Sequence, residues 1–422
     1  MSLAPPTAEQ ANVIHYLEST SDHVFITGKA GAGKTHVLRH FQYATRKNIA
    51  VCAPTGIAAL NASGATIHNL LGLGTGLPAD AGVDIYKVRS KRKHIRELDA
   101  IVIDEVSMVS ADLMDSIDRQ LQGIRQNREP FGGIQIIMFG DIYQLPPVVS
   151  KDDKKYYHQQ GYTSEWFFDA HVWDYTDGFA TFALEKIHRQ NDPTFIHLLN
   201  GVRDGSITQD ELNLLNALGR RPGKTPDAML LSSRRDTAFQ HNKMNLGRIK
   251  GSRDTYRARV NTGFGRLEPA DREIHLKPGA RIMMLSNDRT ERWTNGTRGI
   301  VKSCGPEFIQ VHLDDDSSHT VERFAWVAAG TPPEQYKDAP KYRQFPVKLA
   351  WAVTIHKSQG LSLPEIDVDL GSGAFSPGQT YVALSRVTKP EGLYIKTPLR
   401  MADIKVDTNV KRFFATGGKL GR

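Results

Sequence analysis

The chain has 422 residues, of which 40% are hydrophobic, with 36 glycines and 21 prolines. This composition suits two or three globular domains and excludes a fibrous or largely disordered protein. Lysine and arginine residues number 54 and aspartate and glutamate residues 46, so the net charge of +8 is compatible with a polyanionic partner without demanding one. No apolar run approaches the ~18 residues of a membrane span, and Cys52 and Cys304 form neither a metal-ligand spacing nor a disulfide framework. We therefore expect a soluble cytoplasmic protein with no membrane association.

The first 180 or so residues alternate short apolar stretches with helical patterns. The apolar stretches predict buried strands at residues 23–28, 48–55, 99–105, 134–141 and 179–185. Continuous apolar strands with helical spacers are typical of a parallel sheet covered on both faces. The same alternation predicts a second α/β domain from strands at residues 227–233, 348–355, 365–370 and 392–397.

The region between these two parts has a different residue pattern. The pattern of residues 254–340 predicts short strands separated by Pro-Gly, Asn-Gly and aspartate-rich turns. Such a pattern is typical of an all-β segment. We therefore expect a first domain over residues 1–180 and a second domain over residues 181–253 and 341–422, with a small β-barrel inserted at residues 254–340.

The first predicted strand runs directly into a phosphate-binding loop. The segment GKAGAGKT (28–35) matches the pattern G-x-x-x-x-G-K-[ST] between a strand and a helix. Its backbone N–H groups can face phosphate oxygens, and the helix N-terminus adds the positive end of its dipole. Lys34 is predicted to span the β- and γ-phosphates of ATP, and Thr35 to place its hydroxyl on Mg²⁺. The rest of the predicted cradle is Gly28, Ala30, Gly31, Ala32 and Gly33.

Two adjacent carboxylates follow the apolar stretch AIVI (100–103). Asp104 and Glu105 would be costly to bury at the end of a core strand without a cation. We expect Asp104 to hold Mg²⁺ through water and Glu105 to orient or deprotonate the attacking water. The alternative is a surface Asp-Glu pair at the start of a helix, where acids are favoured.

Two glutamines are weaker candidates on local grounds. Gln10 precedes the first strand, where its amide is able to read both the N6 donor and the N7 acceptor of adenine; the alternative is a solvent-exposed helix residue. Gln144 follows the predicted strand 134–141 and precedes the stiff sequence Leu145-Pro146-Pro147. By itself, Gln144 would be read as an ordinary turn residue.

Nine segments, in order along nearly the whole chain, resemble the superfamily 1 DNA helicases of the petite-integration-frequency (PIF) type, relatives of RecD-like helicases. They are GKAGAGKT, CAPTGIAAL, GATIHNLL, AIVIDEVSMV, REPFGGIQIIMFGDIYQLPPV, LEKIHRQNDPTF, LKPGARIMMLSND with NGTRGIV, LAWAVTIHKSQGLSL, and GQTYVALSRV. The resemblance implies an α/β fold of two RecA-like P-loop NTPase domains, each a parallel sheet with helices on both faces. It also implies a small SH3-like β insertion in the second domain and a short wedge insertion in the first, at about residues 64–95.

The resemblance assigns further residues to the ATP site. It implies that Gln144 senses the γ-phosphate and couples hydrolysis to the DNA site. Arg189 and Arg386 are similar to arginine fingers from the second domain, and a planar, permanently charged guanidinium suits the transition-state charge. For either arginine alone, a surface ion pair is the alternative. Gly360 is expected to let the backbone approach the nucleotide.

The resemblance also implies a track for single-stranded DNA across both domains. Hydroxyls, backbone amides and a lysine suit phosphate contacts that do not depend on sequence, and a histidine ring can stack on a base. For the two histidines, a hydrogen-bonded structural role is the alternative. The residues of the predicted track are Pro54, Thr55, Gly56, His68, Thr354, His356, Lys357 and Ser358.

The function implied is an ATP- and Mg²⁺-dependent DNA helicase that moves 5′-to-3′ on single strands. Its expected partners are single-stranded DNA and forked or 5′-tailed duplexes. We expect a monomer, with a DNA-dependent dimer as the alternative, and nucleoid association if the source is bacterial. Three other functions remain open at this point: a DNA-stimulated ATPase clamp without strand separation, a helicase closer to the RecD-like or conjugative-relaxase type, and a P-loop remodeller that does not act on nucleic acid.

Overall fold

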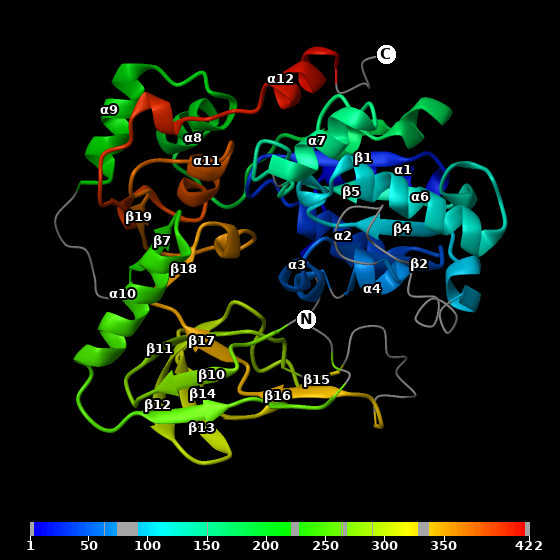
Figure 1. Cartoon of the computed structure of the whole chain (residues 1–422). Helices are drawn as coiled ribbons and strands as arrows, with labels where there is room; N and C mark the ends of the chain where they lie inside the picture. Colours follow the sequence, from blue (N-terminus) through cyan, green and yellow to red (C-terminus); the bar gives the residue numbers. More distant parts are fainter. Residues whose placement is uncertain are drawn as a thin grey trace. The chain divides into compact units, whose positions relative to one another are not determined.

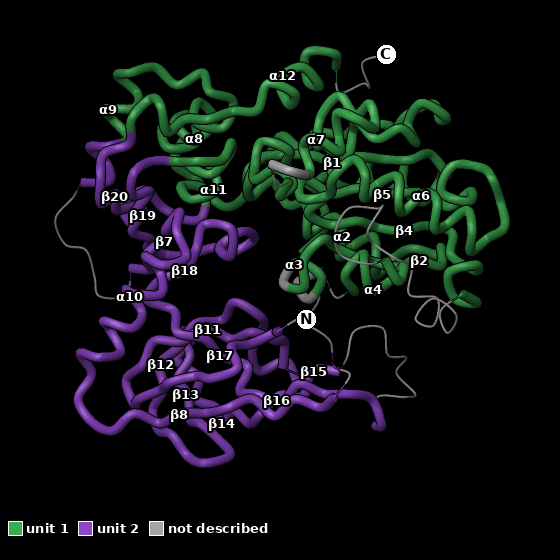
Figure 2. Tube along the Cα trace, in the orientation of Figure 1, with its two compact units in different colours: residues 1–215, 374–385, 400–422 green, residues 216–373, 386–399 purple. Residues whose placement is uncertain are grey.

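The computed structural model divides into two compact units, which are coloured separately in Figure 2. Unit 1 comprises residues 1–215, 374–385 and 400–422, and unit 2 comprises residues 216–373 and 386–399. The residues described below are 4–62, 64–73, 92–149, 151–220, 228–262, 264, 268–288, 290–327 and 337–417. Most of the predicted wedge insertion therefore lies outside the described residues. The predicted domain limits come from changes in sequence pattern along the chain, whereas the two units are defined by contacts. The domain limits therefore stay a prediction.

Unit 1 is built on a six-stranded parallel sheet in the order β3-β2-β4-β5-β1-β6 (Figure 1). The strands are β1 (Val24–Gly28), β2 (Ile49–Ala53), β3 (Ala65–Thr66), β4 (Ala100–Ile103), β5 (Gln135–Phe139) and β6 (Ala180–Leu184). All five predicted strands of this part are confirmed, and the short β3 is added at the edge. Because parallel strands end at the same edge of a sheet, the loops after β1, β4 and β5 meet there.

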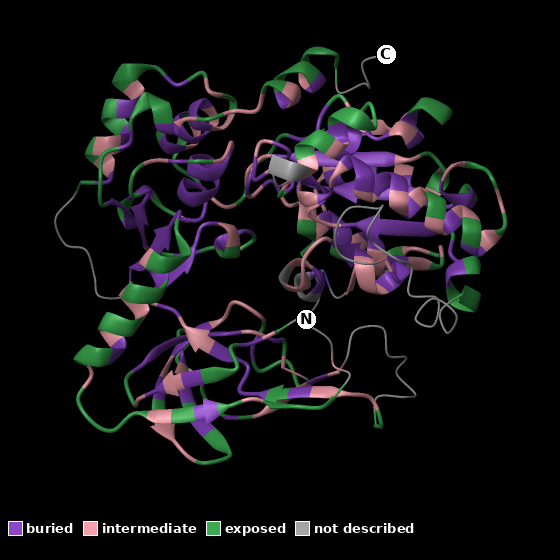
Figure 3. Cartoon of the chain, in the orientation of Figure 1, coloured by how far each residue is buried: buried purple, intermediate pink, exposed green. Residues whose placement is uncertain are grey.

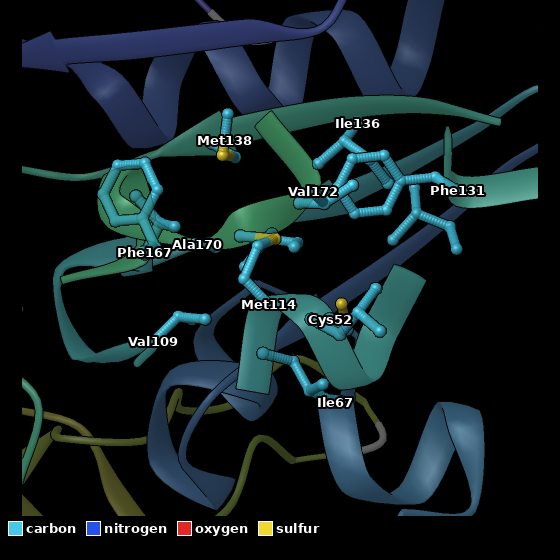
Figure 4. Close-up of a cluster of buried hydrophobic side chains, with 14 of the residues drawn as sticks. Cys52, Ile67, Val109, Met114, Phe131, Ile136, Met138, Phe167, Ala170 and Val172 are labelled. Carbon is cyan, nitrogen blue, oxygen red and sulfur yellow. The ribbon is translucent and has the colours of Figure 1, made fainter. Parts of the chain in front are cut away.

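The central strands β1, β4 and β5 of the unit 1 sheet are buried on both faces (Figure 3). Along β5, Ile137 and Phe139 join the apolar cluster on one face, while Ile136 and Met138 join the cluster on the other. Figure 4 shows the second cluster, in which Met138 and Ile136 lie with Met114, Phe131 and Phe167. This alternation explains why β5 reads as one continuous apolar run: successive side chains point to opposite faces, and both faces are covered.

The helices of unit 1 are α1 (Ala8–Ser19), α2 (Lys34–Ala44), α3 (Gly56–Asn61), α4 (Ile67–Leu71), α6 (Ala111–Arg125), α7 (Lys151–Gln159), α8 (Pro193–Asp204), α11 (Gln379–Leu384) and α12 (Thr408–Ala415), with α9 (Gln209–Leu218) running from unit 1 into unit 2. α1, α2, α3 and α4 contact strands of the sheet, whereas α8 and α11 pack on each other. The short C-terminal α12 packs onto the sheet through Phe413, whose ring lies 6.2 Å from that of Phe25 and 4.7 Å from that of Phe168.

Unit 2 contains the second predicted parallel sheet, in the order β18-β7-β19-β20. Its strands are β7 (Met229–Ser232), β18 (Ala352–Thr354), β19 (Ile366–Asp369) and β20 (Leu393–Ile395), and α10 (Arg235–Arg248) packs against it. The prediction of one strand over residues 348–355 is wrong in detail. β17 (Val347–Leu349) pairs antiparallel with β11 (Arg281–Met284), and the chain changes partner at Ala350 and Trp351 before β18 joins the parallel sheet. Because β17 and β18 are both largely apolar, the hydrophobic periodicity of the sequence could not show the change of partner strand.

The predicted all-β insertion is confirmed as three antiparallel groups, β14-β13-β12-β11-β17, β15-β16-β9 and β10-β8. Their remaining bounds are β8 (Asp254–Arg257), β9 (Arg259–Val260), β10 (Glu273–Leu276), β11 (Arg281–Met284), β12 (Arg298–Cys304), β13 (Phe308–Leu313), β14 (Ser318–Glu322), β15 (Phe324–Val327) and β16 (Lys341–Gln344). Tyr256, Trp293 and Phe345 belong to its apolar core. Among the described residues, no helix is both long and apolar enough to cross a membrane.

Candidate nucleotide and nucleic-acid sites

The predicted phosphate loop leaves β1 and enters α2 with two glycines in the left-handed region. Gly31 has φ 83° and Gly33 has φ 85°, a conformation that glycine adopts without steric cost. The Lys34 ammonium donates to the carbonyl oxygens of Gly28 at 2.6 Å and Lys29 at 3.2 Å. Thr35 follows on the exposed side of the same helical turn. The loop therefore gathers backbone N–H groups, an ammonium and a hydroxyl at the N-terminus of α2.

Two predicted residues from distant parts of the sequence pack directly on this loop. A Cβ atom at Gly31 would stand 2.5 Å from the Cβ of Arg189, and one at Gly33 would stand 2.6 Å from Nε2 of Gln10. Close approach therefore excludes a side chain at Gly31, whereas at Gly33 a side chain would have to displace the Gln10 amide. Gln10 is only 2% exposed, so the reading of it as a solvent-exposed helix residue is wrong. Its Oε1 accepts from the Thr7 N–H at 3.1 Å in a capping box, so that oxygen already has a partner.

The acid pair lies at the end of β4, as expected. Asp104 Oδ1 accepts from the Glu105 N–H at 2.9 Å. Burial, and then the neighbouring Glu105 charge, raise the pKa of Asp104 to about 7. Glu105 has φ 53°, and a left-handed backbone at a non-glycine residue stores strain of the kind found at functional sites. A desolvated carboxylate and the hydroxyl of Thr35 are hard oxygen ligands, the type that Mg²⁺ prefers.

Gln144 lies in the turn after β5, and β5 stands between β1 and β4 in the sheet. The Gln144 side chain is buried, and its Nε2 lies 3.4 Å from Oδ2 of Asp141. Asp141 also accepts from the Tyr143 N–H at 3.2 Å and is paired with Arg203 at 2.9 Å. The structure thus places Gln144 at the same sheet edge as Lys34 and the acid pair.

The two predicted arginine fingers lie in different units. By its contacts Arg189 belongs to unit 1, where its Nη1 donates to the Ser385 carbonyl oxygen at 3.0 Å, whereas the resemblance placed it in the second domain. Burial lowers the pKa of Arg189 below its usual value. Arg386 lies in unit 2, fully buried, with Nη1 3.3 Å from the Leu361 carbonyl oxygen. Gly360, also in unit 2, has φ 81°. The roles of Arg386 and Gly360 at the nucleotide stay predictions.

The part of the predicted DNA track in unit 1 lies between β2 and α4. Pro54 and Thr55 follow β2, and Thr55 Oγ1 accepts from the Ala58 N–H at 3.2 Å at the start of α3. A Cβ atom at Gly56 would meet nothing within 4 Å, so the backbone there faces open space. His68 lies in α4, and burial lowers its pKa, which keeps the ring neutral near pH 7. All four residues are half-buried, and they follow the carboxyl ends of the neighbouring parallel strands β2 and β3.

The part of the track in unit 2 forms around the short helix η6 (His356–Ser358) after β18. Thr354 Oγ1 accepts from the Lys357 N–H at 3.4 Å, and Lys357 is exposed. Burial lowers the pKa of His356. The Ser358 hydroxyl is fully buried and donates to the Ile355 carbonyl oxygen at 2.7 Å. A DNA contact through that hydroxyl would have to break this bond, so the exposed Lys357 is more accessible to DNA than Ser358.

A cavity of about 810 Å³ opens beside Thr354 and Lys357 within unit 2. Its charged side chains are Arg235, Lys243, Arg253, Lys277, Lys348 and Lys357 against Asp271 and Glu273. No hydrogen-bond or ion-pair partner of the Lys348 ammonium is found in the described part of the chain. Burial, and then the charge of Lys357, lower the pKa of Lys348 to about 8. This net basic cavity, which sequence reasoning did not identify, adjoins the predicted track.

Three other residues of the site were missed from the sequence. The Tyr381 hydroxyl accepts from the Ala30 N–H of the phosphate loop at 2.8 Å, and Asp141 and Arg203 form a buried ion pair. Tyr381 and Asp141 lie inside the quoted segments GQTYVALSRV and FGDIYQLPPV, so position within those segments was an available signal. Arg203 lies outside all nine segments, and no local pattern marks it.

The site combines a P-loop at a helix N-terminus with an acid pair that follows a nearby strand of the same parallel sheet. A buried glutamine lies in the turn after the strand between them, and together these features define a P-loop NTPase. The model of the family described as PIF1-like helicase matches residues 7–213. The chain is 32% identical to the ATP-dependent DNA helicase Pif1 of Bdellovibrio bacteriovorus over 418 residues, which is 96% of this chain and 91% of that protein. This chain belongs to the Pif1 helicase family.

Other relatives and solved structures agree with this assignment. The human ATP-dependent DNA helicase PIF1 is 31% identical and aligns over 98% of this chain but only 64% of its own length. Pif1 helicase from Bacteroides in complex with ADP-AlF3 and ssDNA has a TM-score of 0.78 at 34% identity, covering 99% of this chain and 97% of that one. Pif1 helicase from Candida albicans has a TM-score of 0.81 at 29% identity, covering 98% and 99%.

Proposed function

We propose that this ATP-dependent DNA helicase moves 5′-to-3′ along single-stranded DNA and hydrolyses ATP at the phosphate loop of unit 1. One observation carries the proposal. The strand order β4-β5-β1 brings the acid pair, the Gln144 turn and the phosphate loop to a single sheet edge. Similar Pif1 proteins have been solved with ADP-AlF3 and single-stranded DNA, and the relatives are DNA helicases, so a clamp that never separates strands is not favoured.

In the proposed site, the backbone from Gly28 to Gly33 binds the phosphates and Lys34 neutralises their charge. Thr35 and Asp104 would hold Mg²⁺, which supplies charge neutralisation for the phosphate groups. Glu105 orients or deprotonates the attacking water. Gln144, Arg189 and Arg386 are proposed to stabilise the negative charge that develops on the phosphoryl oxygens in the transition state of hydrolysis.

Gln10 is proposed to contact the adenine through its side-chain amide. Its Nε2 already lies against Gly33, whereas its Oε1 is used in the capping box. The donor half of the amide is therefore the half that supports an adenine contact, through a ring nitrogen acceptor such as N7.

The DNA is proposed to contact Pro54, Thr55, Gly56 and His68 on unit 1 and the η6 segment on unit 2. The basic cavity beside Thr354 and Lys357 supports this path, because six basic side chains against two acidic ones suit the phosphates of a polynucleotide. Forked DNA is a proposed substrate, since one similar structure concerns unwinding at forked dsDNA by two coordinating Pif1 helicases. We propose a monomer that is able to pair on such DNA.

The experiment that tests the proposal is strand displacement from duplexes carrying either a 5′ or a 3′ single-stranded tail, with and without ATP and Mg²⁺. We expect ATP-dependent displacement from the 5′-tailed duplex only. Lys34→Ala is the matched control, which should bind the tail but displace nothing. Displacement from the 3′-tailed duplex alone would contradict the direction, and displacement by Lys34→Ala would contradict the ATP site.

A further inference from the structure

Asp141 and Arg203 form a buried ion pair next to the proposed ATP site. The Asp141 side chain is 0% exposed and that of Arg203 is 13% exposed, with Nη2 2.9 Å from Oδ1 and Nε 3.5 Å from Oδ2. This fork-like contact through two nitrogens is specific to arginine. Burial alone would raise the pKa of Asp141, but the charges of Arg203 and Lys34 lower it below its usual range. A buried carboxylate of this kind is stable only while it stays paired.

Asp141 organises the turn that carries the proposed γ-phosphate sensor. Its carbonyl oxygen accepts from the Gln144 N–H at 2.9 Å, and its carboxylate accepts from the Tyr143 N–H and lies 3.4 Å from the Gln144 amide. The guanidinium of Arg203 also lies over the Tyr143 ring, 4.1 Å from its centroid. Arg203 therefore contacts this turn at two points, through the carboxylate and through the ring.

The same carboxylate acts on Lys34. Asp141 is the largest electrostatic influence that raises the pKa of the Lys34 ammonium against the effect of its burial. Asp141 is thus shared between Lys34, which is proposed to bind phosphate, and Arg203. Because the Arg203 guanidinium pairs with the Asp141 carboxylate, the Lys34 ammonium stays available to bind phosphates.

Arg203 is well placed to connect this turn with the rest of the chain. It lies in the last turn of α8, which packs against α11. Arg189 precedes α8 and Arg386 follows α11 after one residue, so both predicted arginine fingers adjoin this helix pair in the sequence.

We propose that Arg203 is a positioning residue for ATP hydrolysis, which holds the Asp141 carboxylate and thereby the turn that carries Gln144. The inference rests on the proposed roles of Lys34 and Gln144. Without Arg203, the buried carboxylate would turn to the nearest remaining cation, Lys34, and the sensor turn would lose its anchor. The chemistry would then slow more than ATP binding would weaken, because small displacements at a reacting centre have large effects on rate.

The test is single-stranded-DNA-stimulated ATP hydrolysis by the full chain at varied ATP concentration. We expect Arg203→Gln to lower kcat by about tenfold or more with a smaller change in KM. Arg203→Lys, which keeps the charge but not the fork, should recover part of the loss. In an Asp141→Asn background, Arg203→Gln should lower kcat no further, because Arg203 acts through that carboxylate. Arg412→Gln, which removes the exposed pair with Asp169 at 2.8 Å, is the control and should leave kcat unchanged.

An unchanged kcat in Arg203→Gln would overturn the inference, and so would an equal loss in the parent and in the Asp141→Asn background. Thermal unfolding shows whether each variant is folded. If Arg203→Gln alone does not fold, Arg203→Lys takes its place, and a kcat equal to that of the parent in this variant overturns the inference. Lys34→Ala in the same assay separates a failure of the proposed ATP site from a failure of the proposed role of Arg203. Hydrolysis by Lys34→Ala contradicts the proposed ATP site, whereas loss in Lys34→Ala with no effect of Arg203→Gln contradicts only the role of Arg203.

Discussion

At the scale of single residues, a neutral side chain suits the position of Gln144. The turn after β5 already contains the carboxylate of Asp141 and lies beside the strand that leads to Lys34. A second anion there would repel the phosphates, and a cation would compete with Lys34 for them. An amide can donate to a phosphoryl oxygen or accept from water without either effect.

The first residue-scale prediction concerns Gln144→Ala. We expect ATP binding to change little, because Lys34 and the loop backbone remain. Stimulation of hydrolysis by DNA should fall by about 100-fold, the range seen when one group that stabilises transition-state charge is removed. The measurement is the ratio of ATPase rates with and without single-stranded DNA, beside the KM for ATP. A ratio equal to that of the parent would contradict the sensor role.

The second residue-scale prediction concerns His23, which is half-buried and directly precedes β1. Its Nδ1 accepts from the Ile136 N–H at 3.1 Å, so the folded state needs a neutral ring. Burial lowers the pKa of His23 to about 4, while an unfolded histidine titrates near ~6.5. The unfolded state therefore binds more protons between these values, and stability should fall as pH drops from about 6.5 to about 4, by up to ~3 kcal/mol.

Thermal unfolding of the parent and of His23→Asn at pH 7.5 and pH 5 checks this expectation. The asparagine amide oxygen is able to accept the same N–H but does not titrate. The variant should therefore lose less stability than the parent on going to pH 5. An identical pH dependence in both proteins would show that other groups control it.

At the scale of elements, α12 illustrates a helix that exists only through packing. With eight residues it is shorter than the ~12 residues at which an isolated helix becomes marginally stable. Val410 and Phe413 are buried in the main apolar cluster of unit 1, and Asp407 caps the helix by accepting from the Asn409 N–H at 2.8 Å. The final helix therefore depends on the aromatic surface beneath it.

The element-scale prediction follows from this dependence. Phe413→Ala should lower the free energy of unfolding of unit 1 by about 3–5 kcal/mol, the usual loss for a buried phenylalanine. Lys411→Ala, on the exposed side of the same helix, should change it by less than ~0.5 kcal/mol. Denaturant unfolding monitored by tryptophan fluorescence is the measurement, since Trp166 and Trp173 lie in the same cluster. Equal losses in both variants would show that the helix is not held by Phe413.

At the scale of the whole molecule, the net charge of +8 is modest for 422 residues, but the fold concentrates it. In the cavity of unit 2, six basic side chains face two acidic ones. Binding of a polynucleotide there releases counterions, so each phosphate contact contributes to the salt dependence of affinity.

The whole-molecule prediction is that Lys348→Ala weakens binding of single-stranded DNA. The slope of log affinity against log salt concentration should fall in magnitude by about 0.7, the value for one contact to a single strand. Lys302→Ala is the matched control, since Lys302 is exposed on β12 and does not line the cavity. Fluorescence anisotropy of a labelled oligonucleotide at several salt concentrations gives both slopes. An unchanged slope in Lys348→Ala would place the DNA elsewhere.

Local patterns in the sequence predicted the parallel strands, the phosphate loop, the acid pair and the resemblance to PIF-type helicases. These features are written in short consecutive stretches, because a buried strand needs a run of apolar residues and the phosphate loop needs eight adjacent positions. The tertiary structure alone decided that β5 lies between β1 and β4, that Gln10 is buried against Gly33 and that the stretch 348–355 divides between two sheets. It also decided the pairing of Asp141 with Arg203. Such contacts depend on which surfaces pack together across distant parts of the chain, and local periodicity carries no record of that choice.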